Sequence, residues 1–131
     1  MTSTSLKQLM AEANSAVESI SVDEAARFSG TTGVKFIDVR ESRERGAAGH
    51  IPNSVHAARG FLELIADPEG PMHNPVFTGD DKLVLYCASG GRSLLAAHTV
   101  VKMGLGNVVN LAGGFNAWRD AALEIEDSPE A

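Results

Sequence analysis

Residues 82–93 read KLVLYCASGGRS, and this stretch decides the fold class. Its first five residues form a nearly continuous apolar run, which is typical of a parallel strand buried on both faces. The run ends at Cys87, four small residues follow, and a helical pattern begins at Ser93 and continues to Met103. A strand, a tight turn and a helix in this order predict one unit of an α/β domain.

Further strand and helix patterns lie on both sides of this unit. Strands are predicted at 34–39, 54–57 and 108–111, and helices or helical turns at 5–19, 21–28, 41–48, 60–66 and 115–123. Residues 67–81 contain three prolines and two glycines, which predict a long surface loop. Strands that alternate with helices predict a parallel sheet with right-handed crossovers.

The first helix carries an apolar stripe that runs from Leu6 to Val17 at helical spacing. We expect this stripe to pack on the rest of the chain, the alternative being a contact between copies. We therefore divide the sequence into a helical extension at 1–20, a domain at 21–124 and a tail at 125–131.

Composition narrows the classes of function. The 131 residues include 17 acidic and 11 basic side chains, a formal charge of -6 that disfavours a broad nucleic-acid-binding surface. The first twenty residues lack an apolar signal region, and no run approaches the roughly 18 apolar residues of a membrane span. These features predict a cytoplasmic protein with neither nucleic acid nor membrane as a partner.

The chain has one cysteine, so it cannot form an internal disulfide. Cys87 is predicted to lie at the carboxyl end of a buried strand and just before a helix, where open α/β sheets bind ligands. The small residues after it allow successive backbone N–H groups to surround the sulfur. Together with the helix N-terminus and Arg92, they would lower the pKa of the thiol. The alternative is a cysteine that acts only as a small core residue. The small residues are Ala88, Ser89, Gly90 and Gly91.

Three segments resemble signatures of the rhodanese-like family. Residues 86–93 (YCASGGRS) resemble its active-site loop. Residues 36–40 (FIDVR) followed by 49–52 (GHIP) resemble its amino-terminal signature, and residues 111–118 (LAGGFNAW) resemble its carboxyl-terminal one. The resemblance covers roughly residues 21–123. It implies a three-layer α/β fold with a five-stranded parallel sheet flanked by helices.

The resemblance also implies a sulfurtransferase. The thiolate of Cys87 would take a sulfane sulfur from a small anionic donor such as thiosulfate and hold it as a persulfide. Without a second cysteine, the sulfur must leave to an external acceptor, which would be cyanide, a thiol or a protein. The backbone of residues 88–93, which ends at Ser93, would cradle the donor, and Arg92 and Arg59 would bind it. The alternative for Arg59 is a solvated cation at a helix start.

Asp38 and Arg40 end a predicted strand, and we expect their pairing to be architectural, with support of the Cys87 loop as the other role. His50, His56, His73 and His98 lack the spacing of metal ligands, so we predict no metal and no cofactor. His73 lies in the proline-rich loop and is a candidate for the entrance of the site. Gly113 and Gly114 predict a tight turn, because the sequence after them does not match a phosphate-binding loop.

Two other classes of function stay open. One is a non-catalytic protein-binding module, although such modules commonly lose the cysteine. The other is a cysteine phosphatase or arsenate reductase, whose loops have five residues between cysteine and arginine where this chain has four. Well-known thiosulfate-using relatives carry two basic residues after the cysteine, where this chain has Ala88 and Ser89. The natural donor, and the choice between monomer and homodimer, are therefore left open.

Overall fold

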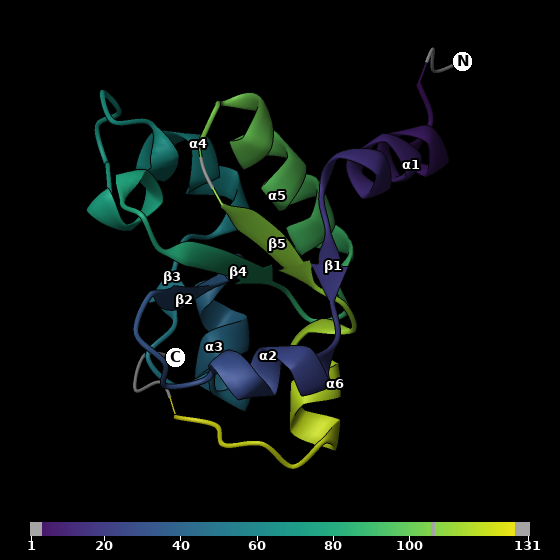
Figure 1. Ribbon diagram of the computed structural model, residues 1–131, viewed down its shortest axis with the longest axis vertical. Helices are drawn as coiled ribbons and strands as arrows, with labels where there is room; N and C mark the ends of the chain where they lie inside the picture. The colour runs from purple at the N-terminus through teal and green to yellow at the C-terminus, as the bar shows by residue number, and fades with distance from the viewer. Residues whose placement is uncertain (1–3, 106, 128–131) are drawn as a thin grey trace.

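The computed structural model describes residues 4–105 and 107–127. Within these ranges the chain alternates between short strands and helices, as the sequence predicts (Figure 1). The elements are α1 (Leu6–Ala16), β1 (Ser19–Ile20), α2 (Val22–Phe28), β2 (Val34–Asp38), α3 (Ser42–Ala48), β3 (Val55–His56), the 3-10 helix η1 (Arg59–Phe61), α4 (Leu62–Ala66), the 3-10 helix η2 (Pro75–Thr78), β4 (Lys82–Tyr86), α5 (Gly91–Lys102), β5 (Val108–Leu111) and α6 (Gly114–Asp120).

The five strands form one parallel sheet in the order β1-β5-β4-β2-β3. The predicted α/β class with a five-stranded parallel sheet is therefore confirmed. Strand β4 lies in the middle of the sheet, which explains why its sequence is apolar on both faces. Four strands match predicted segments, and the fifth is β1, a two-residue edge strand paired with β5.

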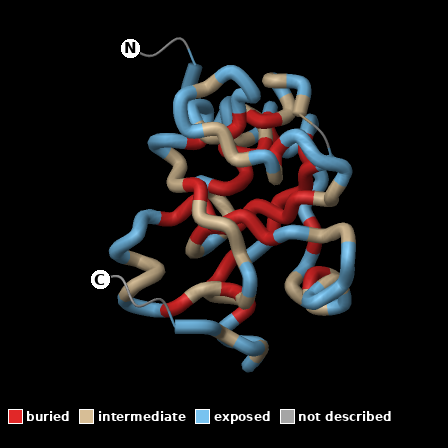
Figure 2. The backbone as a smooth tube through the Cα atoms, turned by 90° about the vertical axis from the view of Figure 1, so that its left-hand side faces the viewer, coloured by how far each residue is buried: buried red, intermediate tan, exposed pale blue. Residues whose placement is uncertain are grey.

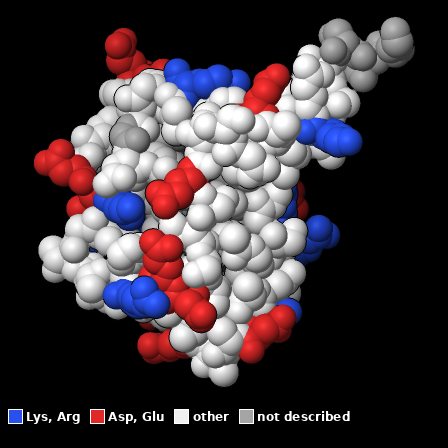
Figure 3. Space-filling model, turned by 45° about the vertical axis from the view of Figure 1, so that its right-hand side comes forward, with Lys and Arg blue, Asp and Glu red and all other residues white. Residues whose placement is uncertain are grey.

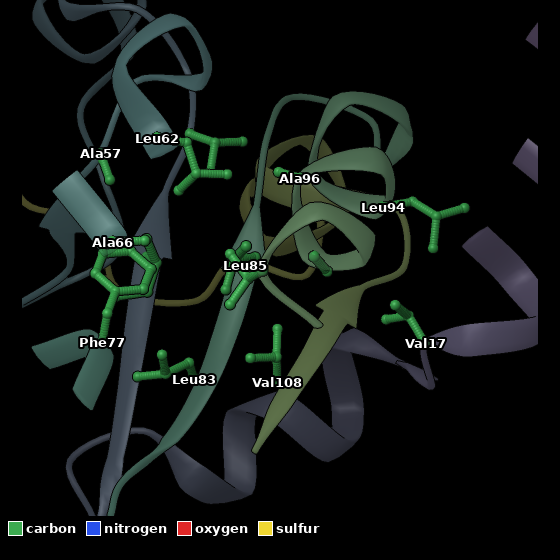
Figure 4. Close-up of a cluster of buried hydrophobic side chains, with 14 of the residues drawn as sticks. Val17, Ala57, Leu62, Ala66, Phe77, Leu83, Leu85, Leu94, Ala96 and Val108 are labelled. Carbon is green, nitrogen blue, oxygen red and sulfur yellow. The ribbon is translucent and has the colours of Figure 1, made fainter. Parts of the chain in front are cut away.

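Helices cover both faces of the sheet, with α1, α4 and α5 on one side and α2, α3 and α6 on the other (Figure 1). Alternate residues of β4 supply the two cores: Leu83 and Leu85 belong to one buried cluster, and Val84 and Tyr86 to the other. Figure 2 shows that the buried residues are concentrated along the sheet. Figure 4 shows the first cluster, in which Leu85 lies between the helices of that face.

After the carboxyl end of β4, helix α5 begins at Gly91, two residues earlier than predicted. Gly90 has a φ of 106°, a left-handed conformation that glycine adopts without strain and that lets the helix begin at Gly91. The predicted helix at 60–66 begins as the 3-10 helix η1 before α4, and η2 adds one short helical turn to the long loop at 67–81.

The N-terminal helix is part of the fold. Ser5 caps α1 by accepting a hydrogen bond from the Gln8 backbone N–H at 3.1 Å. The side chains of Ala13 and Val17 are buried, whereas Leu6 and Leu9 are exposed by 65% and 42%. The stripe therefore packs on the domain from Met10 onward, and its first residues remain exposed.

The predicted tail at 125–131 begins with an ordered contact. Glu126 and His50 exchange two backbone hydrogen bonds, at 2.8 and 2.9 Å. Residues 128–131 lie outside the described residues. Among the residues that are described, no helix combines the length and the apolar character needed to cross a bilayer.

Candidate active site

Cys87 follows the last residue of the central strand β4, at the edge of the sheet where its strands end. Its side chain is only 1% exposed. In an open α/β sheet this edge is where ligands bind, because the loops after the strands converge there. The position of Cys87 agrees with the sequence prediction and places a buried thiol just before α5.

The loop of residues 87–93, here called the Cys87 loop, directs hydrogen-bond donors at the sulfur. The backbone N–H of Gly90 lies 3.1 Å from Sγ, and the backbone N–H and the hydroxyl of Ser93 both lie 3.4 Å from it. Burial raises the pKa of the Cys87 thiol, but the hydrogen bonds from Ser93, Gly90 and Ser89 outweigh it and bring the pKa below its ordinary value. These hydrogen bonds therefore stabilise the thiolate form of Cys87 relative to that of an ordinary cysteine.

A second turn supports the Cys87 loop from outside. The backbone N–H groups of Phe115 and Asn116 donate to the carbonyl oxygens of Cys87 and Ala88, at 2.8 and 3.0 Å. Gly114 lies so close to the loop that an added Cβ would be 2.5 Å from the Cys87 carbonyl oxygen. The tight turn predicted at the Gly113-Gly114 pair is thus also the support of the loop, a role that the sequence analysis missed.

A chain of polar groups leads from the sulfur through buried Ser93 and Asn110 to the exposed Ser19 of the edge strand β1. The hydroxyl of Ser93 lies 2.6 Å from Asn110 Oδ1, and the amide nitrogen of Asn110 donates to Ser19 Oγ at 3.1 Å. Asn110 is 3% exposed within the otherwise apolar strand β5. The sequence analysis did not single out Asn110, although a polar residue inside such a strand is the signal that could have found it.

Arg92 belongs to the Cys87 loop but binds α3. Its guanidinium makes two parallel hydrogen bonds to the Glu44 carboxylate, at 2.7 and 2.8 Å. This pairing is the largest influence that raises the pKa of Arg92, and the nearby Cys87 sulfur adds to it. Arg92 therefore lies beside the thiol, and two of its five N–H donors are used by Glu44. Glu44 is a further site residue that the sequence analysis missed.

Arg92 and Arg59 line the same pocket, which has a volume of about 310 Å³. Arg59 donates to Glu63 at 3.1 Å and to Thr99 Oγ1 at 3.3 Å. The structure thus brings both predicted donor-binding arginines to one opening, whereas Cys87 does not line it. The other lining residues are Val39, Glu41, Ser42, Ala58, Gly60 and Phe61.

Asp38 and Arg40 form a buried ion pair at 2.8 Å, and both side chains are almost fully inaccessible. Asp38 also binds Arg45 at 2.9 Å and accepts a hydrogen bond from the Tyr86 hydroxyl at 2.9 Å. The Arg40 guanidinium donates to the Gly49 carbonyl at 2.7 Å. These contacts hold β2, α3 and β4 together, which fits an architectural role.

The four histidines all lie outside the Cys87 loop. His56 Nε2 lies 2.6 Å from the Arg40 carbonyl oxygen, and His50 lies 3.2 Å from the Glu126 carboxylate. His73, which we expected as a candidate for the entrance, lies 3.5 Å from the Thr78 hydroxyl and does not line the pocket of Arg59 and Arg92, here called the arginine pocket.

On the face shown in Figure 3, basic and acidic side chains alternate without a broad basic area among the described residues.

Comparison with known proteins gives one family. The family model described as "Rhodanese-like domain" matches residues 21–121. A curated "Sulfurtransferase" from Allochromatium vinosum is 33% identical over 99 residues, which cover 76% of this chain and 84% of that protein. "Protein HIGH ARSENIC CONTENT 1, mitochondrial" from Arabidopsis thaliana is 30% identical, over 87% of this chain and 69% of its own length.

A solved structure from Rhodopseudomonas palustris extends the likeness to nearly the whole chain. It is 42% identical, has a TM-score of 0.92, and the match covers 96% of this chain and 97% of that one. That protein is described as one of unknown function and a possible tyrosine phosphatase. The match includes the region of α1, which lies outside the family model.

Proposed function

The chain belongs to the rhodanese-like family of sulfurtransferases, and we propose that it moves a sulfane sulfur from a donor to an acceptor as a persulfide on Cys87. The observation that carries this proposal is the set of hydrogen-bond donors around the buried sulfur. Gly90 and Ser93 direct N–H groups at Sγ from 3.1 and 3.4 Å. These donors stabilise negative charge on the thiolate before transfer and on the persulfide after it.

The reaction has two displacement steps. In the first, the Cys87 thiolate attacks the outer sulfur of thiosulfate, the bond between the two donor sulfurs breaks, and sulfite leaves with the bonding electron pair. In the second, cyanide or a thiolate attacks the outer sulfur of the persulfide, and Cys87 leaves again as a thiolate. No oxidant is consumed, and the single cysteine suits release to an external acceptor.

Other residues of the loop and pocket would hold the donor. The backbone of residues 88–93 would form the anion cradle, and the donor would enter through the pocket that Arg92 and Arg59 line. The acceptor would be a thiol or a protein, and we place the reaction in the cytoplasm. Mitochondrial and chloroplastic relatives are also named among the matches.

Intact-protein mass spectrometry after incubation with thiosulfate tests this function. We expect wild-type protein to gain the mass of one sulfur atom, and we expect cyanide to remove it. Cys87→Ala gives the control, since it lacks the nucleophile. Aryl phosphate and arsenate are assayed beside thiosulfate, because one similar protein is a possible tyrosine phosphatase and another is named for high arsenic content.

Each outcome separates one class of function. Sulfur that adds to wild type alone and transfers to cyanide supports the sulfurtransferase. Turnover of aryl phosphate or arsenate that depends on Cys87, without sulfur loading, would replace it by the phosphatase or reductase class. The absence of all three activities with thiosulfate and other sulfane donors would favour a binding module.

A further inference from the structure

The arginine pocket carries its positive charges in paired form. Arg92 gives two hydrogen bonds to Glu44, and Arg59 binds Glu63 at 3.1 Å. The bidentate geometry at Arg92 is the stronger of the two arrangements, because both donors of one guanidinium edge are used by one carboxylate. A donor that enters this pocket therefore meets no guanidinium that lacks a carboxylate partner among the described lining residues.

Glu44 is held in place by its own helix. Besides the two bonds from Arg92, its carboxylate accepts the backbone N–H of Glu41 at 2.9 Å, as part of the capping box at the start of α3. The hydrogen bonds from Arg92 are the main reason why the pKa of Glu44 falls to about 2. Glu44 is therefore a fixed negative charge at neutral pH.

An anion that approaches Arg92 must share the guanidinium with this carboxylate or displace it. The electrostatic repulsion between the carboxylate and the donor grows in proportion to the donor's charge. For a dianion this repulsion is twice that for a monoanion. The two residues after the cysteine, Ala88 and Ser89, carry no positive charge that would offset it. The N–H groups around the sulfur, by contrast, face a single negative charge, that of the thiolate or persulfide.

We infer that Glu44 determines the donor specificity of this site: by occupying Arg92, it disfavours dianionic sulfur donors such as thiosulfate relative to monoanionic ones. This inference rests on the proposed sulfurtransferase function. Glu44 acts through Arg92 and the local charge, so it is a specificity-determining residue and not a catalytic one.

Two donors that differ by one charge test the inference. Thiosulfate is a dianion and releases sulfite, whereas methanethiosulfonate is a monoanion and releases methanesulfinate when the same kind of S–S bond breaks. The rate of persulfide formation on Cys87 is measured by mass spectrometry with each donor, below saturation. The specificity is the ratio of the thiosulfate rate constant to the methanethiosulfonate rate constant.

Glu44→Gln should raise this ratio about ten-fold, the order expected when one charge is removed a few ångström from the donor at a partly exposed site. Glutamine is also accepted in the capping box, so α3 keeps its cap. Glu44→Asp retains the charge and should leave the ratio within about two-fold of wild type. Asp80→Asn removes an exposed charge next to the opposite end of β4 and controls for the change in net charge.

The outcomes distinguish this inference from the proposed function. If neither donor loads wild-type Cys87, the sulfurtransferase proposal fails. If both donors load Cys87 and the ratio is the same in Glu44→Gln as in wild type, the function stands and the inference is overturned. An equal rise in Asp80→Asn would also overturn it, because net charge and not Glu44 would then control the ratio.

Discussion

The hydroxyl oxygen of Ser93 lies 2.6 Å from the Oδ1 atom of Asn110, and both residues are buried. The same hydroxyl lies 3.4 Å from Cys87 Sγ. A hydroxyl has one proton, so it can donate to the asparagine or to the sulfur but not fully to both. A thiolate or persulfide is the better acceptor because it is charged, and we expect the Ser93 proton to turn toward it.

Ser93→Ala should make Cys87 less reactive near neutral pH. The Ser93 side chain is the largest of the hydrogen-bonding influences that lower the pKa of the thiol, so its loss moves the pKa upward. A hydrogen bond to a charged group is typically worth enough to slow alkylation by iodoacetamide about ten-fold at pH 7. The measurement is the alkylation rate as a function of pH, followed by mass spectrometry.

Ser89→Ala is the matched control. Ser89 contributes to the thiol environment through its backbone N–H, which alanine keeps. The pH profile of alkylation should therefore stay in place in this variant. A profile that shifts as far in Ser89→Ala as in Ser93→Ala would contradict the role given to the Ser93 hydroxyl.

Gly114→Ala should destabilise the protein by about 2 kcal/mol, since it adds a side chain at a left-handed position and against a carbonyl group. The φ of Gly114 is 59°, and the new Cβ would lie 2.5 Å from the Cys87 carbonyl oxygen. Urea unfolding measures the free energy of unfolding. Gly60→Ala provides the comparison, because no heavy atom lies within 4 Å of its added Cβ. Equal stability of the two variants would argue against close packing of the turn on the loop.

The sequence predicted the elements that carry enough pattern in themselves. Strands β4 and β5 are short, mainly apolar runs, as expected of strands whose two faces are both buried. Ser21 predicts the start of α2, and its hydroxyl accepts the Glu24 backbone N–H at 3.1 Å. Strand β1 was not predicted, because two residues, one of them serine, give no periodicity. Its pairing depends on β5, a segment far along the chain.

The site was predictable where its atoms are neighbours in sequence. The N–H groups that approach Cys87 come from the next six residues. The small residues of that loop are therefore enough to predict them. Glu44 and Asn110 reach the loop only after α3 and β5 have packed beside it. No spacing in the sequence encodes which face of α3 meets Arg92, so the pairing of Arg92 had to come from the structure.

The Asp38 carboxylate should make stability depend on acid. Burial raises its pKa, but hydrogen bonds and charge from Arg40 together outweigh this and hold the pKa below its ordinary value. The contribution of Asp38 to stability is therefore complete above the ordinary carboxyl pKa of about 4 and is lost as pH falls through the lower native value. Wild-type protein should lose stability below about pH 4, measured as the free energy of unfolding in urea.

Asp38→Asn gives the converse result. It leaves Arg40 without its buried partner, so it should cost about 3 kcal/mol at pH 7. Its stability should then fall less steeply with acid than that of wild type. Some acid dependence remains, since Glu44 also has a lowered pKa. A wild-type curve and a variant curve that run parallel below pH 4 would refute the assignment of this linkage to Asp38.

The N-terminal helix should be required for stability although it lies outside the residues matched by the family model. Ala13 of α1 is fully buried, and Met10 of the same helix lies within 4.0 Å of where a Cβ of Gly91 would be. Ala13→Asp would bury a charge at the contact between α1 and α5, and should destabilise the protein by about 3 kcal/mol or more. Leu6→Ser is the comparison on the same helix, because Leu6 is 65% exposed, and it should change the free energy of unfolding by less than about 0.5 kcal/mol. If both variants unfold at the urea concentration of wild type, α1 contributes little to the domain, and the packing of its carboxyl-terminal half would have no energetic consequence.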